Sequence, residues 1–463
     1  MIKRLALIFI LIYSYQAESQ NWGSVSGNFS AEVEALMYDS VHDELIASGK
    51  FIQFVDGKYV RGCARWNGSR WDSLASGINT DDTINSVPFG TISACIPYQS
   101  QLLVGGNFHS IGGLKTNGLA LWDGTKWDTL PKQAFSPNST SLINGLFKYN
   151  NLIYIRGRFD SIAGQKCSGM ATWDGINFNP IILPVSYIGG IPEMLLYKNE
   201  LYIVGAIYSP NDFTSGLYHI LRYNGITWYD VGGGIKGGGF TGAGTFAIYN
   251  NELYVGGHFS KSDGNAGDNI MKWDGTQWYD VGFGDTPAWM AVRKLLVHHN
   301  KLWAFGPFEE AAGSFASRAA VFDGTTWCGL KDTLTNNMSS ALVYKDTIYI
   351  GGGYWNVNST PLTYVAKLKD ENSFNQCVYV STNELSNKNQ IAVYPNPTNS
   401  IINIVDEFNQ FQNATIQIKN YLGQVVYTNS FTNQIDLSNF SSGMYFLTIH
   451  DKNNIKTVKI TKN

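Results

Sequence analysis

The stretch that decides the fold is "ELYVGGHF", Glu252 to Phe259, followed by "KWDGTQW", Lys272 to Trp278. The first part is rich in β-branched and aromatic residues and ends in two glycines, and the second part holds Asp-Gly between two strand-like halves. Paired glycines also occur where a phosphate approaches the backbone, but such a loop leads into a helix and is needed once. The number of copies therefore separates a ligand loop from a building block.

Both parts recur along the chain with a period of about 50 residues. The glycine-containing part has further copies in "LIASGKF" from Leu45, "LLVGGNF" from Leu102, "LIYIRGRF" from Leu152, "LYIVGAIY" from Leu201, "LWAFGPF" from Leu302 and "IYIGGGY" from Ile348. The second part recurs in step, in "RWNGSRW" from Arg65, "LWDGTKW" from Leu121, "TWDGINF" from Thr172, "RYNGITW" from Arg222 and "VFDGTTW" from Val321. The glycines are therefore predicted to be scaffolding.

Each repeat is predicted to form a four-stranded antiparallel meander, because two apolar runs precede the Asp-Gly hairpin and its two halves. Seven copies predict an all-β, seven-bladed β-propeller. The last copy, "YVAKLKD" after Thr363, keeps the strand but lacks the Asp-Gly turn. The N-terminal "NWGSVSG", Asn21 to Gly27, matches outer-strand sequence and is predicted to complete that blade, which closes the ring and removes an exposed edge.

The composition agrees with a well-filled β protein. The 463 residues include 48 glycines, with 14% aromatic and 15% charged residues. Lys plus Arg number 33 against 36 Asp plus Glu, for a net charge of -3, and no basic run is present. The chain therefore lacks the electrostatic footprint of a nucleic-acid-binding protein, and no nucleic-acid partner is expected.

The N-terminus, residues 1–19, has the pattern of a signal peptide. Lys3 and Arg4 precede a short apolar run, and small residues follow, so cleavage is predicted between Ser19 and Gln20. The apolar run is shorter than the roughly 20 residues of a membrane span. An N-terminal anchor helix is the alternative, and no later stretch is expected to be a transmembrane segment.

The repeat resembles the kelch-type propeller, in which a strand ends in Gly-Gly and two aromatic residues follow at fixed spacing, as in Gly106, Trp122 and Trp127. The resemblance covers about Asn21 to Asp370 and implies a binding platform, a structural repeat or, in some members, an oxidase. The copper oxidases of this fold need two Tyr and two His ligands and a Cys-linked Tyr, a set that nothing here marks. The hairpins are also similar to the sialidase Asp-box, but that motif separates Asp from Gly by one residue.

The last 75 residues change character, since Trp and Gly-Gly disappear and strands with alternating polarity follow one another. They resemble the C-terminal sorting domain of type IX secretion cargo, a small Ig-like β-sandwich that the secretion machinery recognises. The resemblance implies export across both membranes, followed by release or surface attachment. The matching residues are Tyr394, Pro395, Asn396, Pro397, Gly423, Gln424, Ser442, Gly443, Met444 and Tyr445.

These patterns predict four segments. Residues 1–19 are the signal peptide, 20–370 the propeller, 371–390 a polar linker and 391–463 the sorting domain. The mature protein is expected to be secreted or held at the outer cell surface.

No motif marks a catalytic or metal site. The seven histidines include no H-E-x-x-H or H-x-H spacing, no cysteines form C-x-x-C, and no G-x-S-x-G elbow occurs. The acidic pairs Asp81–Asp82 and Glu309–Glu310 fall in expected loops, where solvated carboxylates are the more common outcome. No cofactor and no metal are therefore expected, although a carboxylate pair assembled from different blades is beyond the reach of sequence.

Two functional classes remain open. The favoured one is a non-enzymatic binding or adhesion protein whose propeller face engages a glycan or protein; the alternative is a glycan-active hydrolase or lyase on the same face. The uneven loops after Leu74, Val231 and Val281 emerge on that face, where specificity can reside. The candidate ligand residues there are Asp82, His109, Phe240, His258, Trp289 and Trp355.

One disulfide is predicted, between Cys328 and Cys377. Cys328 follows Trp327 in the outer strand of the sixth blade, and Cys377 lies just beyond the third strand of the seventh, so adjacent blades bring them near each other. Closing a loop of this size is worth about 4 kcal/mol in the chain-entropy model. The alternative is that both remain free thiols.

Overall fold

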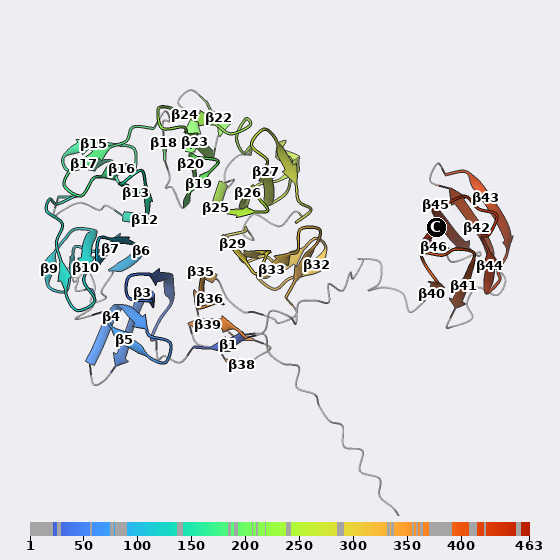
Figure 1. Ribbon diagram of the computed structural model, residues 1–463, viewed down its shortest axis with the longest axis horizontal. Helices are drawn as coiled ribbons and strands as arrows, with labels where there is room; N and C mark the ends of the chain where they lie inside the picture. The colour runs from blue at the N-terminus through green and yellow to red at the C-terminus, as the bar shows by residue number, and fades with distance from the viewer. Residues whose placement is uncertain are drawn as a thin grey trace, which may run out of the picture. The chain divides into compact units, whose positions relative to one another are not determined.

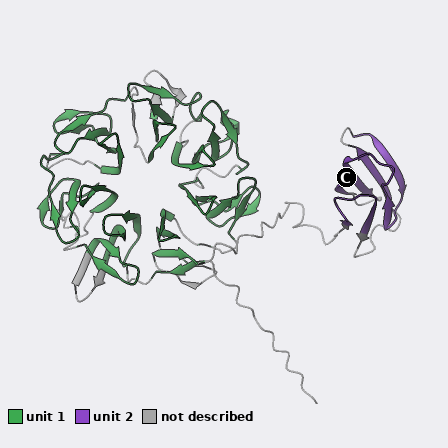
Figure 2. Cartoon of the chain, in the orientation of Figure 1, with its two compact units in different colours: residues 1–379 green, residues 380–463 purple. Residues whose placement is uncertain are grey.

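The chain folds into two compact units, Met1–Tyr379 and Val380–Asn463 (Figure 2). Among the described residues, no helix combines the length and hydrophobicity that a membrane span requires. The computed structural model describes residues 22–25, 29–55, 58–74, 78, 90–136, 142–183, 187–188, 193–205, 207–209, 212–217, 219–237, 242–284, 291–330, 334, 338–353, 356–357, 360–361, 364–369, 391–406, 414–420, 423–450 and 455–463.

The described residues of the first unit form seven four-stranded antiparallel sheets, which stand around a common centre in sequence order (Figure 1). This arrangement is a β-propeller, as predicted, and the sheets are numbered here as blades 1 to 7. The first strand of each blade faces the centre of the ring. These inner strands are β2 (Val33–Asp39), β6 (Thr91–Tyr98), β12 (Leu142–Tyr149), β19 (Glu193–Tyr197), β25 (Gly242–Tyr249), β29 (Lys294–His298) and β35 (Met338–Tyr344).

Three further strands complete each blade outward. The second strands are β3 (Glu44–Val55), β7 (Gln101–Asn107), β13 (Leu152–Arg158), β20 (Glu200–Val204), β26 (Glu252–His258), β30 (Lys301–Phe305) and β36 (Thr347–Gly352). The third strands are β4 (Lys58–Trp66), β10 (Leu119–Trp122), β16 (Met170–Trp173), β23 (Ile220–Tyr223), β27 (Ile270–Trp273), β33 (Ala319–Phe322) and β39 (Val365–Leu368). The outer strands are β5 (Trp71–Ser73), β11 (Trp127–Asp128), β17 (Phe178–Pro180), β24 (Trp228–Asp230), β28 (Trp278–Asp280), β34 (Trp327–Gly329) and β1 (Trp22–Ser24).

Short elements lie between the second and third strands of several blades. They are the hairpins β8 (Ser110–Ile111) with β9 (Leu114–Lys115), β14 (Ser161–Ile162) with β15 (Gln165–Lys166), β21 (Ile207–Ser209) with β22 (Asp212–Leu217), β31 (Glu310–Ala311) with β32 (Ser314–Phe315) and β37 (Asn356–Val357) with β38 (Thr360–Pro361), and the 3₁₀ turn η1 (Lys261–Asp263). β18 (Tyr187–Ile188), which precedes the inner strand of blade 4, pairs with β21. The propeller is thus built almost wholly of strands and tight turns.

The ring is closed by the N-terminus, as predicted. β1 pairs antiparallel with β39 of blade 7, with Trp22 opposite Leu368, and the Val25 amide donates to the Val365 carbonyl at 3.1 Å. Trp22 is completely buried in the core between blades 6 and 7, beside Trp303. The first described strand of the chain therefore covers the edge that the last strand of the propeller would otherwise expose.

The paired glycines are required by sterics on two sides. A Cβ atom on Gly257 would lie 2.1 Å from the carbonyl oxygen of Gly242, where the inner strand of the same blade begins. A Cβ atom on Gly256 would lie 2.8 Å from Cγ1 of Val292, which belongs to the next blade. The second glycine therefore allows close packing of two strands within its own blade, and the first allows close packing against the next blade. The second glycine is present in all seven: Gly49, Gly106, Gly157, Gly205, Gly257, Gly306 and Gly352.

We expect Gly257→Ala to lower the free energy of unfolding by about 1–3 kcal/mol, because the added methyl group overlaps a backbone oxygen and the strand must shift. Gly244→Ala in the same blade is the matched control, since a Cβ atom there meets nothing within 4 Å. Urea unfolding followed by tryptophan fluorescence measures both. Equal midpoints for the two variants would contradict the steric account of the repeat.

The Asp-Gly turns are local structural devices. In blade 5 the Asp274 Oδ1 atom accepts the Thr276 hydroxyl at 2.7 Å and the backbone amides of Gln277 at 2.9 Å and Thr276 at 2.6 Å, and these bonds lower the pKa of Asp274. Asn67 takes the same role in blade 1. The two aromatic residues that flank each turn face each other across the strand pair, as Trp273 opposite Trp278 does. The motif therefore shapes a hairpin and places large rings between blades.

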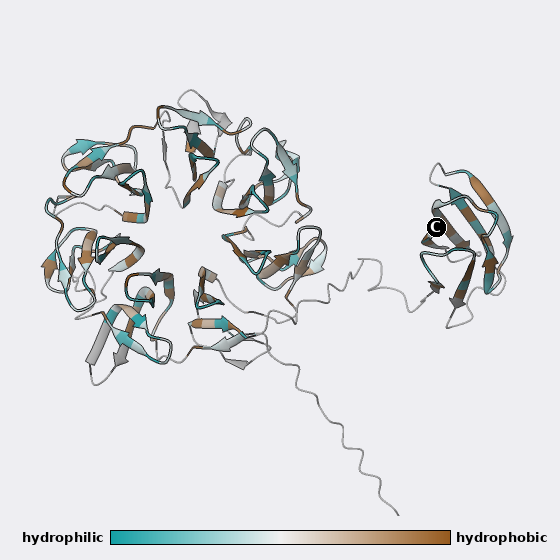
Figure 3. Ribbon diagram, viewed as in Figure 1, coloured by the Kyte–Doolittle hydropathy of each residue, from teal (hydrophilic) through white to brown (hydrophobic). Residues whose placement is uncertain are grey.

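The second unit is a sandwich of two antiparallel sheets. Along its strands, hydrophobic and hydrophilic residues alternate (Figure 3), and in β45 Tyr445, Leu447 and Ile449 are buried. The first sheet contains β40 (Ile391–Tyr394), β41 (Ile401–Asp406) and β44 (Gln434–Asp436). The second contains β42 (Thr415–Asn420), β43 (Val425–Ser430), β45 (Gly443–His450) and β46 (Ile455–Lys462).

Several sorting-motif residues hold this sandwich together. The Asn396 side chain donates to the Lys459 carbonyl at 2.7 Å and accepts the Thr461 amide at 2.9 Å, which ties the first motif to the last strand. Gly423 occupies the left-handed position of the turn between β42 and β43. The Tyr445 hydroxyl donates to the Ser441 carbonyl at 2.8 Å. The motif thus describes a fold, while Tyr394 and Met444 remain exposed on its surface.

Candidate functional site

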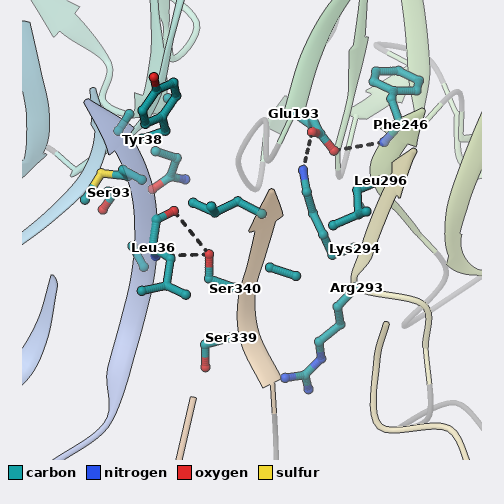
Figure 4. Close-up of a pocket in the computed structure, with 18 of the residues that line it drawn as sticks. Leu36, Tyr38, Ser93, Glu193, Phe246, Arg293, Lys294, Leu296, Ser339 and Ser340 are labelled. Atoms are coloured by element: carbon teal, nitrogen blue, oxygen red, sulfur yellow. Dashed lines mark hydrogen bonds and ion pairs between the residues drawn. The ribbon is translucent and has the colours of Figure 1, made fainter. Parts of the chain in front are cut away.

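The inner strands of all seven blades enclose a central channel with a volume of about 870 Å³. Backbone and side chains of β2, β6, β12, β19, β25, β29 and β35 line it, and Figure 4 shows part of its wall. The lining mixes aliphatic residues such as Leu36 and Leu296 with polar residues such as Ser339. A cavity of this size with a few convergent polar groups has the properties of a small-ligand site.

Bulges direct small or polar residues into this channel. In five inner strands the register shifts by one residue, so that one extra residue is inserted opposite the second strand. A bulge bends the strand and changes the direction of the side chain it carries. All five inserted residues line the channel: Glu34, Ser93, Asn144, Gly244 and Ser339.

Charged side chains occur at the next position of the repeat, which lies four residues before the end of each inner strand. Most blades have a small residue there, and blades 4 and 6 have Glu193 and Lys294. Blade 6 also has Arg293 at the position of the bulge residues. The small residues in the other blades are Ala35, Ala94, Gly145, Thr245 and Ser340.

Glu193 connects three blades. Its Oε1 atom lies 2.6 Å from Lys294 Nζ of blade 6, and its Oε2 atom accepts the Phe246 amide of blade 5 at 2.8 Å (Figure 4). Both side chains are about three-quarters buried, with relative exposures of 21% for Glu193 and 34% for Lys294. The carboxylate therefore pairs with the lysine ammonium group at the channel wall and links the inner strands of blades 4, 5 and 6.

Arg156 adds a second cation beside Glu193. It stands in blade 3 where blades 2, 5 and 7 have the first glycine of the pair. The small size of Gly145 makes room for it, since a Cβ atom on Gly145 would lie 2.2 Å from the Arg156 guanidinium carbon. Burial lowers the pKa of Arg156 to about 10, and Glu193 opposes that shift. The guanidinium group is therefore charged at neutral pH.

Arg293 is the exposed cation of the channel. It lines the cavity, and among the described residues no ion pair joins it to a carboxylate. Glu34 of blade 1 is paired with Lys50 at 2.8 Å. Both described carboxylates of the channel are therefore neutralised, and Arg156 and Arg293 leave it with an excess of positive charge.

Of the six ligand residues singled out from sequence, the structure describes two, and these two lie away from the channel. His109 follows β7 and accepts the Thr116 and Asn117 amides through its carbonyl, and His258 ends β26; neither lines the cavity. Asp82, Phe240, Trp289 and Trp355 lie outside the described residues, as do Ser19 and Gln20.

The cysteines divide into two groups. Cys63, Cys95 and Cys167 carry free thiols, and burial raises the pKa of each. Cys328 is buried in the core between blades 6 and 7 and is disulfide-bonded. Cys377 lies outside the described residues, so the Cys328–Cys377 bridge stays a prediction.

The fold and the channel define a β-propeller protein with a basic central cavity. Residues 392–463 match the family model described as a secretion system C-terminal sorting domain. This match confirms the sorting-domain prediction and indicates that the chain is exported by type IX secretion, to the cell surface or into the medium.

No curated protein matches the chain. Among solved structures it is similar to the extracellular domain of a hybrid two-component system from B. thetaiotaomicron, with 12% identity, a TM-score of 0.45 and coverage of 95% of this chain and 60% of that one. A second such domain from B. thetaiotaomicron has 10% identity, a TM-score of 0.41 and coverages of 96% and 58%. The β-propeller domain of the trilobed protease from Pyrococcus furiosus has 10% identity, a TM-score of 0.40 and coverages of 77% and 99%. The chain thus spans about three-fifths of each B. thetaiotaomicron domain.

Proposed function

We infer that this exported protein is a binding protein whose propeller channel takes a carboxylate-bearing ligand, presented by an acidic glycan or an acidic protein segment. The observation that carries this proposal is Arg293, an exposed guanidinium group at a channel whose own carboxylates are already paired. Guanidinium is suited to carboxylate recognition because its planar N–H groups bind both oxygens at once. Arg156 and Lys294 supplement the positive field of the site.

The geometry favours binding over glycan cleavage. A glycosidase needs one carboxyl group to donate a proton and a second to act as a base or nucleophile. In the channel Glu193 is held by Lys294 and a backbone amide, and Glu34 is held by Lys50. Both carboxylates are thus already engaged in ion pairs, so the channel does not present the pair of free carboxyl groups that the reaction requires.

The segment boundaries belong to the same proposal. A signal peptide at 1–19 opens the export route, a kelch-like propeller at 20–370 carries the ligand site, a linker at 371–390 follows, and the sorting domain at 391–463 directs the second crossing. The two compact units and the family match from residue 392 support this division.

Arg293→Ala is expected to weaken ligand binding about tenfold or more, because it removes a charge-assisted hydrogen bond worth about 1.5–3 kcal/mol. Oligogalacturonate and an acidic peptide serve as carboxylate probes, and a neutral cello-oligosaccharide serves as the uncharged comparison, all by calorimetry on the mature chain. Lys126→Ala, which removes an exposed cation from an outer hairpin, is the matched control. Binding that is equal in both variants, or equal for charged and neutral probes, would refute the proposal.

A further inference from the structure

A cluster of possible metal ligands lies at the turns between the first and second strands of blades 6 and 7. His298 ends β29, His299 follows it, and Asp346 lies in the turn between β35 and β36. The Nε2 atoms of His298 and His299 lie 4.0 Å and 3.1 Å from the Asp346 Oδ1 atom, and the three donor atoms all lie within 4.8 Å of one another. The two imidazole rings are stacked, with centroids 3.9 Å apart.

The repeat explains why these groups meet. The last inner-strand residue is a tyrosine in most blades, and its hydroxyl donates to a turn carbonyl of the following blade, as Tyr249 does to Asn300 at 3.1 Å and Tyr344 does to Asp43 at 3.0 Å. Blade 6 has His298 at this position. An imidazole in the place of the phenol therefore projects toward the turn of blade 7, which carries Asp346.

The ammonium group of the adjacent Lys345 pairs with a carboxylate of another blade. Lys345 precedes Asp346, but its Nζ atom lies 3.1 Å from the Asp43 carboxylate of blade 1. The Asp346 side chain is 77% exposed and that of His299 is 53% exposed, whereas His298 is 6% exposed. One donor is thus fixed by burial, and two can adjust around an ion that arrives from solvent.

We propose that His298, His299 and Asp346 bind a divalent transition-metal ion, with Zn²⁺ as the expected occupant, between blades 6 and 7. Donors on a tetrahedral Zn²⁺ with bonds of about 2.0–2.1 Å lie about 3.3 Å apart, close to the His299–Asp346 separation. The remaining separations require only small rotations of the two exposed side chains. Two imidazoles and one carboxylate suit Zn²⁺, Cu²⁺ or Ni²⁺, whereas Ca²⁺ prefers oxygen donors.

The test uses the untagged mature chain, stripped with EDTA and titrated with ZnCl₂ by calorimetry. One Zn²⁺ per chain is expected, with a rise in melting temperature because only the folded chain brings the three donors together. CaCl₂ is expected to give neither heat nor stabilisation at this site. Failure of Zn²⁺ to bind the wild-type chain would overturn the proposal.

The repeat itself supplies variants that keep the fold. The double variant His298→Tyr/His299→Asn places in blade 6 the residues that stand at Tyr249 and Asn250 in blade 5. It is expected to lower Zn²⁺ affinity at least tenfold and to remove the thermal shift. Equal Zn²⁺ binding by this variant and the wild-type chain would place the ion elsewhere, for example on the free thiols, and refute the site.

Asp346→Asn provides a second test, which leaves the buried His298 unchanged. It is expected to weaken Zn²⁺ binding at least tenfold, because it replaces a charged donor on the surface. Asp128→Asn is the control, since Asp128 is an exposed carboxylate in blade 2 and, among the described residues, belongs to no cluster of metal-donor groups. An equal effect of the two substitutions would contradict the assignment of Asp346 as a ligand.

Discussion

Deletion of residues 21–27 is expected to lower the melting temperature of the mature protein by about 5 °C or more. Trp22 is completely buried, and loss of a buried tryptophan side chain costs about 3–5 kcal/mol. One kcal/mol corresponds to about 2–4 °C in domains of 150–250 residues and to less in a larger one. The deletion also removes the three-residue pairing of β1 with β39 and leaves β39 as an open edge.

Two single substitutions distinguish the contribution of the buried Trp22 side chain from the effect of shortening the chain. Trp22→Ala keeps the strand backbone but removes the side chain between blades 6 and 7, and most of the destabilisation is expected from it alone. Ser24→Ala is the control, because Ser24 is exposed in the same strand. Calorimetry gives the melting temperatures, and size-exclusion chromatography detects association through the open edge. A deletion variant that melts with the wild-type protein would disprove closure by this strand.

The propeller could be predicted because its determinants are local and repeated. The Asp-Gly hairpin, the glycine pair and the flanking aromatic residues each act within one blade or between neighbours, so every copy of the sequence reports the same geometry. The closing strand was predictable for the same reason. "NWGSVSG" has outer-strand character without a blade of its own, and β1 takes the outer position of blade 7.

The channel site could not be found from motifs, because its lining is distributed over the inner strands of all seven blades. The groups that bind Glu193 are the backbone amide of Phe246 in blade 5 and the ammonium group of Lys294 in blade 6, which lie far along the chain. A signal was nevertheless present in the repeat. Glu193 and Lys294 break a position that is otherwise small, and Arg156 stands where three other blades have the first glycine of the pair. These departures from the repeat at fixed positions are the sequence signal for the proposed site.

The proposed metal ligands show the same kind of departure from the repeat. His298 and His299 are adjacent, a spacing that differs from H-E-x-x-H and H-x-H, and the third donor comes from the next blade. Substitution of the repeat tyrosine by His298 is visible in the sequence only after the blades are aligned. The partner Asp346 then follows from the hydrogen bond that the tyrosine makes in other blades.

Removal of residues 391–463 is expected to abolish appearance of the protein outside the cell and to leave the propeller in the periplasm. The segment from residue 392 matches the sorting-domain family and forms a compact unit with its own core, including Ile402, Ile416 and Leu447. The propeller core lies within the other unit, so the truncated chain is expected to fold. Fractionation of a host that has type IX machinery, with antibody detection, measures the effect.

Fusing the tail to an unrelated carrier separates a sorting signal from a requirement for propeller stability. A carrier with a signal peptide and residues 380–463 is expected to leave the cell, whereas the same carrier without the tail remains periplasmic. A periplasmic enzyme assayed in the medium controls for lysis. Asn396 bonds to the strand that ends the chain, so Asn396→Ala in the fusion is expected to reduce export through loss of the tail fold. Extracellular propeller after truncation, with the periplasmic enzyme retained, would show that export does not depend on this domain.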